Sequence, residues 1–297
     1  IMPRSRIDEA IAIAGIEGVI FCTLADMMRV PGSKGSLAQL RAGGADIRAL
    51  YSPLDVISIA QENPDKKVVF FAIGFETTTP MSAVVVEQAI NLGLKNLFVH
   101  INHVTVPAPV RAIMSDKDVK IDAFLGPSHV SVITGSAIYE ELADEFGTPI
   151  AVSGFEPLDL MDSILNLVNQ HENGTHKVYN EYARVVSNQG NLKAKELINK
   201  YLEPCDFEWR GLGVIPMSGM KLRDEFGTLD ARKHFNVEVG ESKESKACIC
   251  GEILRGKAKP YDCKVFGKVC NPQNPIGSCM VSGEGACAAY YKYTKRG

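Results

Sequence analysis

Between Gly18 and His171 the sequence alternates short apolar runs with amphipathic stretches, and this alternation restricts the fold more than any other feature. The runs are rich in β-branched and aromatic residues with few polar positions, which is typical of strands covered on both faces. Strands that alternate with helices in this way form parallel sheets with crossover helices. The expected strands are Val19–Thr23, Ile47–Tyr51, Val68–Ile73, Leu97–Ile101, Ala123–Leu125 and Pro149–Val152.

Helical patterns fill the intervals between these runs. The expected helices are Ser36–Arg41, Leu54–Glu62, Met81–Asn91, Val110–Ser115, Ala137–Phe146 and Leu158–Gln170. In the last of them, apolar residues recur at positions 158, 161, 164, 165 and 168, which form one face of a helix. Farther along, Asn191–Tyr201 predicts another amphipathic helix, and the Gly-rich stretch Trp209–Gly219 indicates a strand with bulges. The pattern therefore predicts an α/β protein.

Six of the eight cysteines fall within residues 248–287, in a segment with little periodicity. Their spacing, C-x-C-x12-C-x6-C-x8-C-x7-C, differs from the C-x2-C pairs of zinc ribbons and from the compact run of bacterial ferredoxins. Almost no histidine is nearby, so an all-sulfur site is favoured, and thiolates select zinc, Cu(I) or iron–sulfur. We expect an iron–sulfur cluster, with zinc, buried thiols or a redox disulfide as alternatives. Cys22, at the end of an expected strand, is predicted to be a small core residue.

Two glutamates and one histidine are candidates for acid–base or binding roles in a crevice. Gly-Phe-Glu follows two of the expected strands, which places Glu76 and Glu156 at the edge of the sheet where α/β proteins bind ligands. His129 also follows a strand, and histidine is the usual proton carrier near neutral pH. Each residue has a structural interpretation too, because a carboxylate is favoured near a helix N-terminus and a histidine can be a hydrogen-bonded, partly buried residue.

The composition excludes several classes of function. The net charge is −3 and the basic residues are scattered, so we expect no nucleic-acid partner. The longest apolar runs are far below the ~20 residues of a membrane span, so we expect no membrane association. We recognise no secretory signal, and clustered cysteines then indicate a cytoplasmic protein with a metal site. Neither a phosphate-binding loop nor a Ser-His-Asp order is visible.

Seven stretches spread along the chain carry recognisable motifs, among them Gly-Phe-Glu-Thr-Thr and Glu-Trp-Arg-Gly-Leu-Gly-Val-Ile. They are Ile1–Asp8, Ile20–Gly32, Gly74–Thr78, Ile121–Ser131, Gly154–Leu160, Glu208–Ile215 and Met280–Ala289. Together they resemble the HypD family of [NiFe]-hydrogenase maturation (formation) proteins. Because they run the length of the chain, the resemblance is specific.

The resemblance implies two related parallel-sheet α/β domains and an irregular C-terminal iron–sulfur domain. We expect residues 1–62 to be the remainder of the first α/β domain and residues 63–175 the second. Residues 176–297 would form the C-terminal domain, with a [4Fe–4S] site within 248–287. The family spacing C-x12-C-x6-C-x16-C implies the ligands Cys250, Cys263, Cys270 and Cys287, and it leaves out Cys248 and Cys279.

The resemblance also implies a function, that of an assembly scaffold with a redox role rather than a conventional enzyme. Such a scaffold helps to assemble an iron with two cyanide ligands and one carbon monoxide, working with HypC and HypE. Its cluster passes electrons to a thiol pair near that iron. The family's Cys-Gly-x-His-x-His and Gly-Pro-Gly-Cys-Pro-x-Cys motifs do not occur in this sequence. We therefore expect this polypeptide to hold the cluster without assembling the iron–cyanide unit.

Two other interpretations stay open at this point. The first is a zinc-stapled two-domain protein whose crevice binds a small anion. The second assigns acid–base work in the crevice to Glu76, Glu156 and His129.

Overall fold

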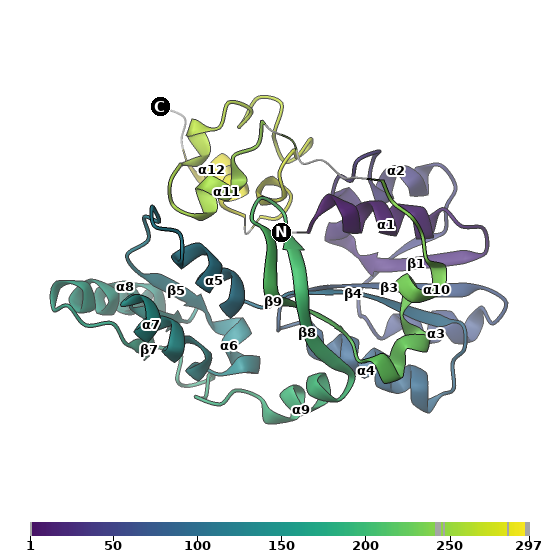
Figure 1. Ribbon diagram of the computed structural model, residues 1–297, viewed down its shortest axis with the longest axis horizontal. Helices are drawn as coiled ribbons and strands as arrows, with labels where there is room; N and C mark the ends of the chain where they lie inside the picture. Colours follow the sequence, from purple (N-terminus) through teal and green to yellow (C-terminus); the bar gives the residue numbers. More distant parts are fainter. Residues whose placement is uncertain (1, 241–244, 246, 284, 295–297) are drawn as a thin grey trace.

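The computed structural model describes residues 2–240, 245, 247–283 and 285–294. Two parallel sheets lie on either side of a central antiparallel hairpin, and a C-terminal segment of short helices lies above them (Figure 1). The sheet orders are β2-β1-β3-β4, β5-β6-β7 and β8-β9. The strands are β1 (Val19–Leu24), β2 (Ile47–Leu50), β3 (Lys67–Gly74), β4 (Leu97–His103), β5 (Phe124–Pro127), β6 (Ile150–Ser153), β7 (Val178–Asn180), β8 (Leu202–Trp209) and β9 (Gly213–Leu222).

The four-stranded sheet is buried on both faces, because alternate residues of each strand enter different cores. Ile20 and Cys22 of β1 face one core, whereas Val19 and Phe21 face the other. Cys22 is fully buried, as predicted, and burial raises the pKa of its thiol to about 12. The helices that cover this sheet are α1 (Arg4–Ala14) and α2 (Leu37–Ala42) on one face, and α3 (Asp55–Glu62) and α4 (Thr79–Asn91) on the other.

The three-stranded sheet carries a smaller core, centred on Tyr139, Leu142 and Val152. Around it lie the helices α5 (Pro107–Met114), α6 (Ser128–Thr134), η2 (Ala137–Tyr139), α7 (Glu140–Phe146) and α8 (Pro157–Glu172). The predicted α8 is confirmed, but its apolar face does not pack on the sheet. Leu158 and Met161 are 81% and 64% exposed, whereas Asp159, Ser163 and Leu167 are the buried residues of this helix.

All six strands that the sequence predicts are present, with ends shifted by at most two residues. The boundaries that we expected after residues 62 and 175 both fall inside a sheet. β3 pairs with β1 across the first, and β7 pairs with β6 across the second. The predicted strand over Trp209–Gly219 is wrong in its extent, because residues 210–212 form the turn between β8 and β9. Helices α1 and α6 and strands β7 and β8 were not predicted.

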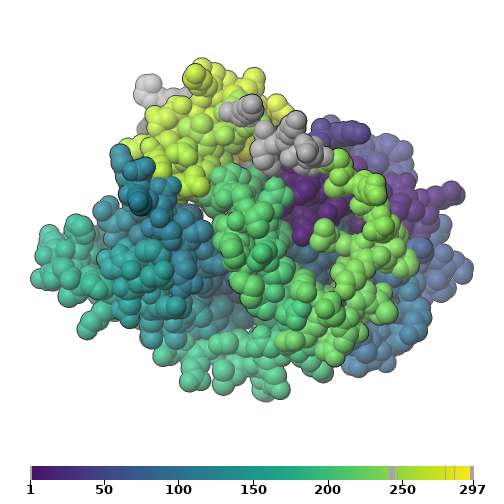
Figure 2. Space-filling view, viewed as in Figure 1, coloured from purple at the N-terminus to yellow at the C-terminus, as the bar shows by residue number. Residues whose placement is uncertain are grey.

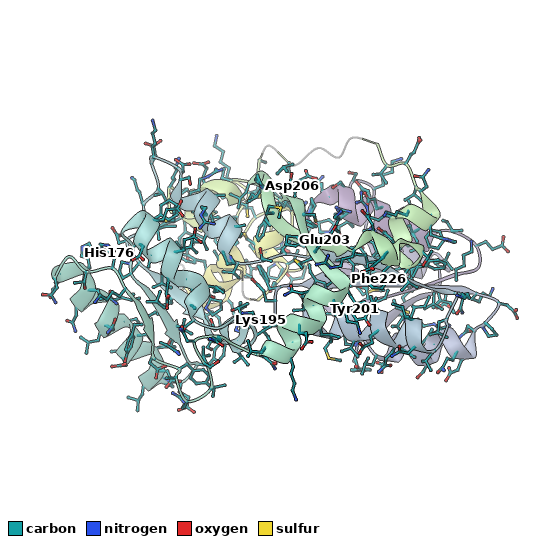
Figure 3. The ribbon with its side chains drawn as sticks, turned by 60° about the horizontal axis from the view of Figure 1, so that its bottom comes forward. His176, Lys195, Tyr201, Glu203, Asp206 and Phe226 are labelled. Carbon is teal, nitrogen blue, oxygen red and sulfur yellow. The ribbon has the colours of Figure 1, made fainter. Side chains whose placement is uncertain are left out.

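Helix α9 (Leu192–Tyr201) and the β8–β9 hairpin join the two α/β units. The N–H of Thr105, just after β4, donates to the carbonyl of Ser218 in β9 at 2.9 Å. At the far end of the hairpin, Tyr201 packs its ring on Phe226 with centroids 5.0 Å apart (Figure 3). The Tyr201 hydroxyl also donates to Glu87 of α4 at 3.0 Å. The hairpin is therefore fixed along its length to the first unit.

After the hairpin come η3 (Asp224–Leu229) and α10 (Ala231–Phe235), and then the C-terminal segment. Within residues 247–283 and 285–294, its helices are α11 (Cys250–Leu254), η4 (Pro260–Asp262), η5 (Ser278–Met280) and α12 (Ala286–Tyr293). The segment rests on top of the molecule (Figure 2), where Asp116 accepts from Lys257 at 2.8 Å and pairs with Arg255 at 3.3 Å. In the part of the chain that the structure describes, no helix is long and apolar enough to cross a membrane.

A buried polar network ties α10 to the first sheet. Arg232 donates to both carboxylate oxygens of Glu9 in α1, at 2.9 and 3.0 Å. The Nε2 of His100 in β4 lies 3.1 Å from Glu9 Oε2, and Asn102 Nδ2 lies 2.8 Å from His100 Nδ1. Because the Asn102 amide donates to Nδ1, the neutral His100 ring carries its proton on Nε2 and donates to Glu9. Burial lowers the pKa of His100, in agreement with this neutral form.

Glu9→Ala should destabilise the protein by about 3 kcal/mol, because it leaves the fully buried His100 and the mostly buried Arg6 without their acceptor. Chemical denaturation compares this variant with wild type. Glu141→Ala is a matched control, since Glu141 pairs with Arg111 but its side chain is 82% exposed, and it should cost less than about 1 kcal/mol. Equal losses in the two variants would contradict a central role for the Glu9 network.

The contribution of Glu9 should also depend on pH. Burial raises the pKa of Glu9, but the His100 hydrogen bond and the Arg6 and Arg232 guanidinium groups outweigh it and hold the pKa at about 2, below the ordinary value of 4.5. The stability that ionised Glu9 supplies is therefore present above about pH 4.5 and is lost as the pH falls toward about 2. The stability difference between wild type and Glu9→Gln should stay constant above about pH 5 and narrow as the pH falls from about 4.5 toward about 2. A constant difference over this range would show that the carboxylate charge is not involved.

Candidate metal centre

All six C-terminal cysteines line one small cavity. Its walls are completed by Ile249, Ile253, Val265, Phe266, Gly277 and Met280. The thiols come from separate turns: Cys250 begins α11, Cys263 follows η4, Cys279 lies in η5 and Cys287 lies in the first turn of α12. Cys250, Cys263 and Cys270 are buried and the other three are partly buried. The structure thus brings together every residue of the predicted site, including the two that the family spacing leaves out.

Local turns hold these cysteines in place. The N–H of Lys259 donates to Asp262 at 2.7 Å, which closes the turn before Cys263. The side chain of Asn271 accepts from the N–H groups of Gln273 at 3.1 Å and Asn274 at 2.9 Å, and such a turn requires a short polar side chain. It reverses the chain directly after Cys270. Backbone N–H groups in these irregular turns therefore donate hydrogen bonds to side chains of the same segment.

Close backbone packing surrounds the thiols. A Cβ atom on Gly277 would lie 2.6 Å from the sulfur of Cys248, and one on Gly251 would lie 2.3 Å from the carbonyl oxygen of Gly211. Gly211 belongs to the β8–β9 turn and has φ +83°, a conformation that favours glycine. The hairpin turn and the first turn of α11 thus touch backbone to backbone, beside Cys250.

The thiols of Cys248 and Cys287 have a raised pKa. A hydrogen bond with Cys250, followed by burial, raises the pKa of Cys248. Burial, followed by the charges of the other cysteines, raises the pKa of Cys287 to about 12. By contrast, the hydrogen bond with Cys250 lowers the pKa of Cys279. Several thiolates can share this cavity only with compensating positive charge, which a bound metal supplies as it displaces protons.

The donors that line the cavity are all thiols, and thiolates select zinc, Cu(I) or iron–sulfur. Among the residues that the structure describes, no three or more His, Cys, Asp or Glu side chains form a group that could hold a metal ion.

The structure does not gather Glu76, Glu156 and His129 into one site. Glu76 is 9% exposed and accepts from the N–H of Val106 at 2.9 Å, while its Oε2 has no partner among the described groups. Burial raises the pKa of this carboxyl. It lines a separate cavity of about 320 Å³ that also includes Lys195, a residue labelled in Figure 3.

Glu156 and His129 belong to the other α/β unit, and both are exposed. Glu156 caps α8, where its side chain and that of Asp159 satisfy each other's backbone N–H groups. This is the structural role that a carboxylate at a helix N-terminus suggests. His129 lies beside the same turn, with its ring centroid 5.6 Å from that of Phe155. No contact of either residue with Glu76 is among the described interactions.

One residue near the thiols escaped the sequence analysis. Arg210, in the hairpin turn, is 4% exposed and donates to the carbonyl oxygen of Ile276 at 3.3 Å. A buried arginine cannot be recognised from composition, since most arginines are exposed. Its place inside the motif Glu208–Ile215 was the available signal.

Comparisons with known proteins show the family to which this chain belongs. The HypD family model, described as "Hydrogenase formation hypA family", matches residues 1–294. The chain is 50% identical over 303 residues to hydrogenase maturation factor HypD of Azotobacter vinelandii, covering 100% of this chain and 80% of that protein. It is 45% identical over 297 residues to the HypD of Escherichia coli, again with 100% and 80% coverage. The chain belongs to the HypD family of hydrogenase maturation factors.

Gly251→Ala should separate the hairpin turn from α11, because the new methyl group would overlap the Gly211 carbonyl. Overpacking of this kind typically costs about 1–3 kcal/mol. The expected result is a lower thermal midpoint and faster reaction of the metal-free cysteines with a thiol reagent. Gly240→Ala is the control, since nothing lies within 4 Å of the added atom. Unchanged thiol reactivity in Gly251→Ala would show that the hairpin does not support the cysteine cavity.

Proposed function

We propose that this protein is a scaffold in [NiFe]-hydrogenase maturation whose C-terminal cysteines hold a [4Fe–4S] cluster. In this proposal it contributes the cluster to a scaffold that works with HypC and HypE, in the cytoplasm, on an iron that carries two cyanides and one carbon monoxide. That iron unit is the cargo, and the cluster is the resident cofactor. Cys250, Cys263, Cys270 and Cys287 are the cluster ligands.

The observation that carries the proposal is the convergence of these thiols. Residues 37 positions apart in sequence, Cys250 and Cys287, line the same cavity together with Cys263 and Cys270. A segment that has few regular elements needs an external constraint to stay ordered, and metal binding provides one. Family membership supports the maturation role, since the relatives are named hydrogenase maturation factors.

When bound, the cluster would supply one-electron transfer. The protein residues determine where and how readily this occurs. Phe266 and Met280 line the cavity, are 9% and 1% exposed, and keep water from the sulfurs. The N–H of Ile276 donates to the sulfur of Cys270 at 3.3 Å, and such bonds stabilise a thiolate ligand. These residues create the dry, hydrogen-bonded surroundings on which a cluster potential depends.

Serine substitution tests the ligand assignment. After anaerobic reconstitution with iron and sulfide, wild type should show iron, acid-labile sulfide and broad visible absorption. Each of Cys250→Ser, Cys263→Ser, Cys270→Ser and Cys287→Ser should lose most of this absorption, because an alcohol is a poor ligand for a site built on thiolates. Cys248→Ser and Cys279→Ser are matched controls from the same cavity and should keep the full content.

The iron, zinc and sulfide contents of the same samples distinguish the cluster from a zinc site. Zinc without sulfide in wild type would overturn the cluster and favour a zinc-stapled protein. Loss of the cluster in Cys248→Ser or Cys279→Ser would overturn the assignment of these four ligands. A complementation assay in cells that lack their own maturation factor, with HypC and HypE present, tests the scaffold role separately.

A further inference from the structure

Arg210 connects three parts of the molecule that are distant in sequence. It lies in the turn between β8 and β9 and is almost completely buried. Its Nη1 donates to the carbonyl oxygen of Pro31 at 3.5 Å, and its Nη2 donates to that of Ile276 at 3.3 Å. Pro31 follows η1 (Ala25–Arg29) of the first α/β unit, whereas Ile276 belongs to the cysteine segment. The planar guanidinium can reach both carbonyls at once because its donors are arranged as a fork.

The contact with Ile276 leads directly to a proposed cluster ligand. The carbonyl of Ile276 accepts from Arg210, and the N–H of the same residue donates to the sulfur of Cys270. Arg210 thus holds the carbonyl of Ile276 while the N–H of Ile276 donates to the Cys270 sulfur. If the carbonyl is released, the N–H···S hydrogen bond is free to lengthen.

The hairpin turn also keeps the positive charge of Arg210 near the thiols. Gly211 packs against Gly251, next to Cys250, and leaves no room between the two backbones. Arg210 precedes Gly211 in this turn, and its Nη2 donates to the carbonyl oxygen of Ile276, whose N–H donates to the Cys270 sulfur. The guanidinium is therefore a fixed charge at the edge of the cavity.

We propose that Arg210 is a positioning residue that raises the reduction potential of the cluster. It does so by holding the Ile276 N–H against the Cys270 sulfur and by placing a positive charge beside the thiolates. Reduction adds one electron, and hence one negative charge, to the cluster and its ligands. Donors and positive charge stabilise the reduced form more than the oxidised form. This inference rests on the proposed cluster and adds a residue that binds neither iron nor sulfide.

The test is a redox titration of the full reconstituted chain, with dithionite as the electron donor and with visible absorption and electron paramagnetic resonance as readouts. Arg210→Gln should keep iron and sulfide but be about tenfold harder to reduce, equivalent to ~59 mV for one electron. Arg210→Lys should fall between this variant and wild type, because an ammonium keeps the charge without reaching both carbonyls. Arg41→Gln, which removes the same charge from an exposed position in α2, should match wild type.

The outcomes distinguish this inference from the proposed function. If wild type binds no sulfide-bridged iron, both are wrong. If wild type and Arg210→Gln carry full clusters with equal potentials, only the role of Arg210 is wrong. If Arg210→Gln fails to hold a cluster, Arg210→Lys decides: a lowered potential supports the inference, and the wild-type potential overturns it.

Discussion

The cysteine segment depends on its contact with the β8–β9 hairpin. This segment has short helices and turns but little core of its own, so its geometry has to be imposed by the surrounding structure. Gly211 and Gly251 allow the two backbones to touch, and Arg210 extends from the same turn to the carbonyl of Ile276. The hairpin in turn is fixed by Thr105 and Tyr201 to the first α/β unit. The large sheet thereby fixes the hairpin, and the hairpin fixes the segment that carries the thiols.

Strands β1 to β6 of the two parallel sheets could be predicted because their residues are apolar on both faces of the sheet. In β1 and β3 nearly every position is apolar, and adjacent residues enter opposite cores. Such a run has no other stable environment than the middle of a parallel sheet. Elements without this property escaped prediction: β7 has three residues, too few to show a period, and α1 has no side-chain cap at Pro3. The boundaries expected after residues 62 and 175 each fall between paired strands, because order along the chain does not specify which strands pair.

The candidate site residues also differ in how far the sequence could predict their surroundings. The six cysteines could be recognised together because thiols are rare and their clustering is itself a chemical signal. Glu76, Glu156 and His129 share a sequence context, but the fold gives them different surroundings. Glu76 is buried with its carboxyl pKa raised, Glu156 caps a helix and His129 packs near Phe155. A repeated motif therefore predicts a shared local turn and does not predict a shared site.

The sequence by itself determined the parallel α/β architecture, the positions of strands β1 to β6 and the clustering of six thiols in one segment, because these follow from local periodicity and residue chemistry. The tertiary structure decided which surfaces meet. It buried Ser163 and Leu167 of α8 while Leu158 and Met161 stayed exposed, although the apolar period alone would have buried the opposite face. It also placed Arg210 against the carbonyl oxygen of Ile276, 66 residues away, whose N–H donates to the Cys270 sulfur. Such contacts depend on how separate elements pack, and no local pattern in the chain specifies that packing.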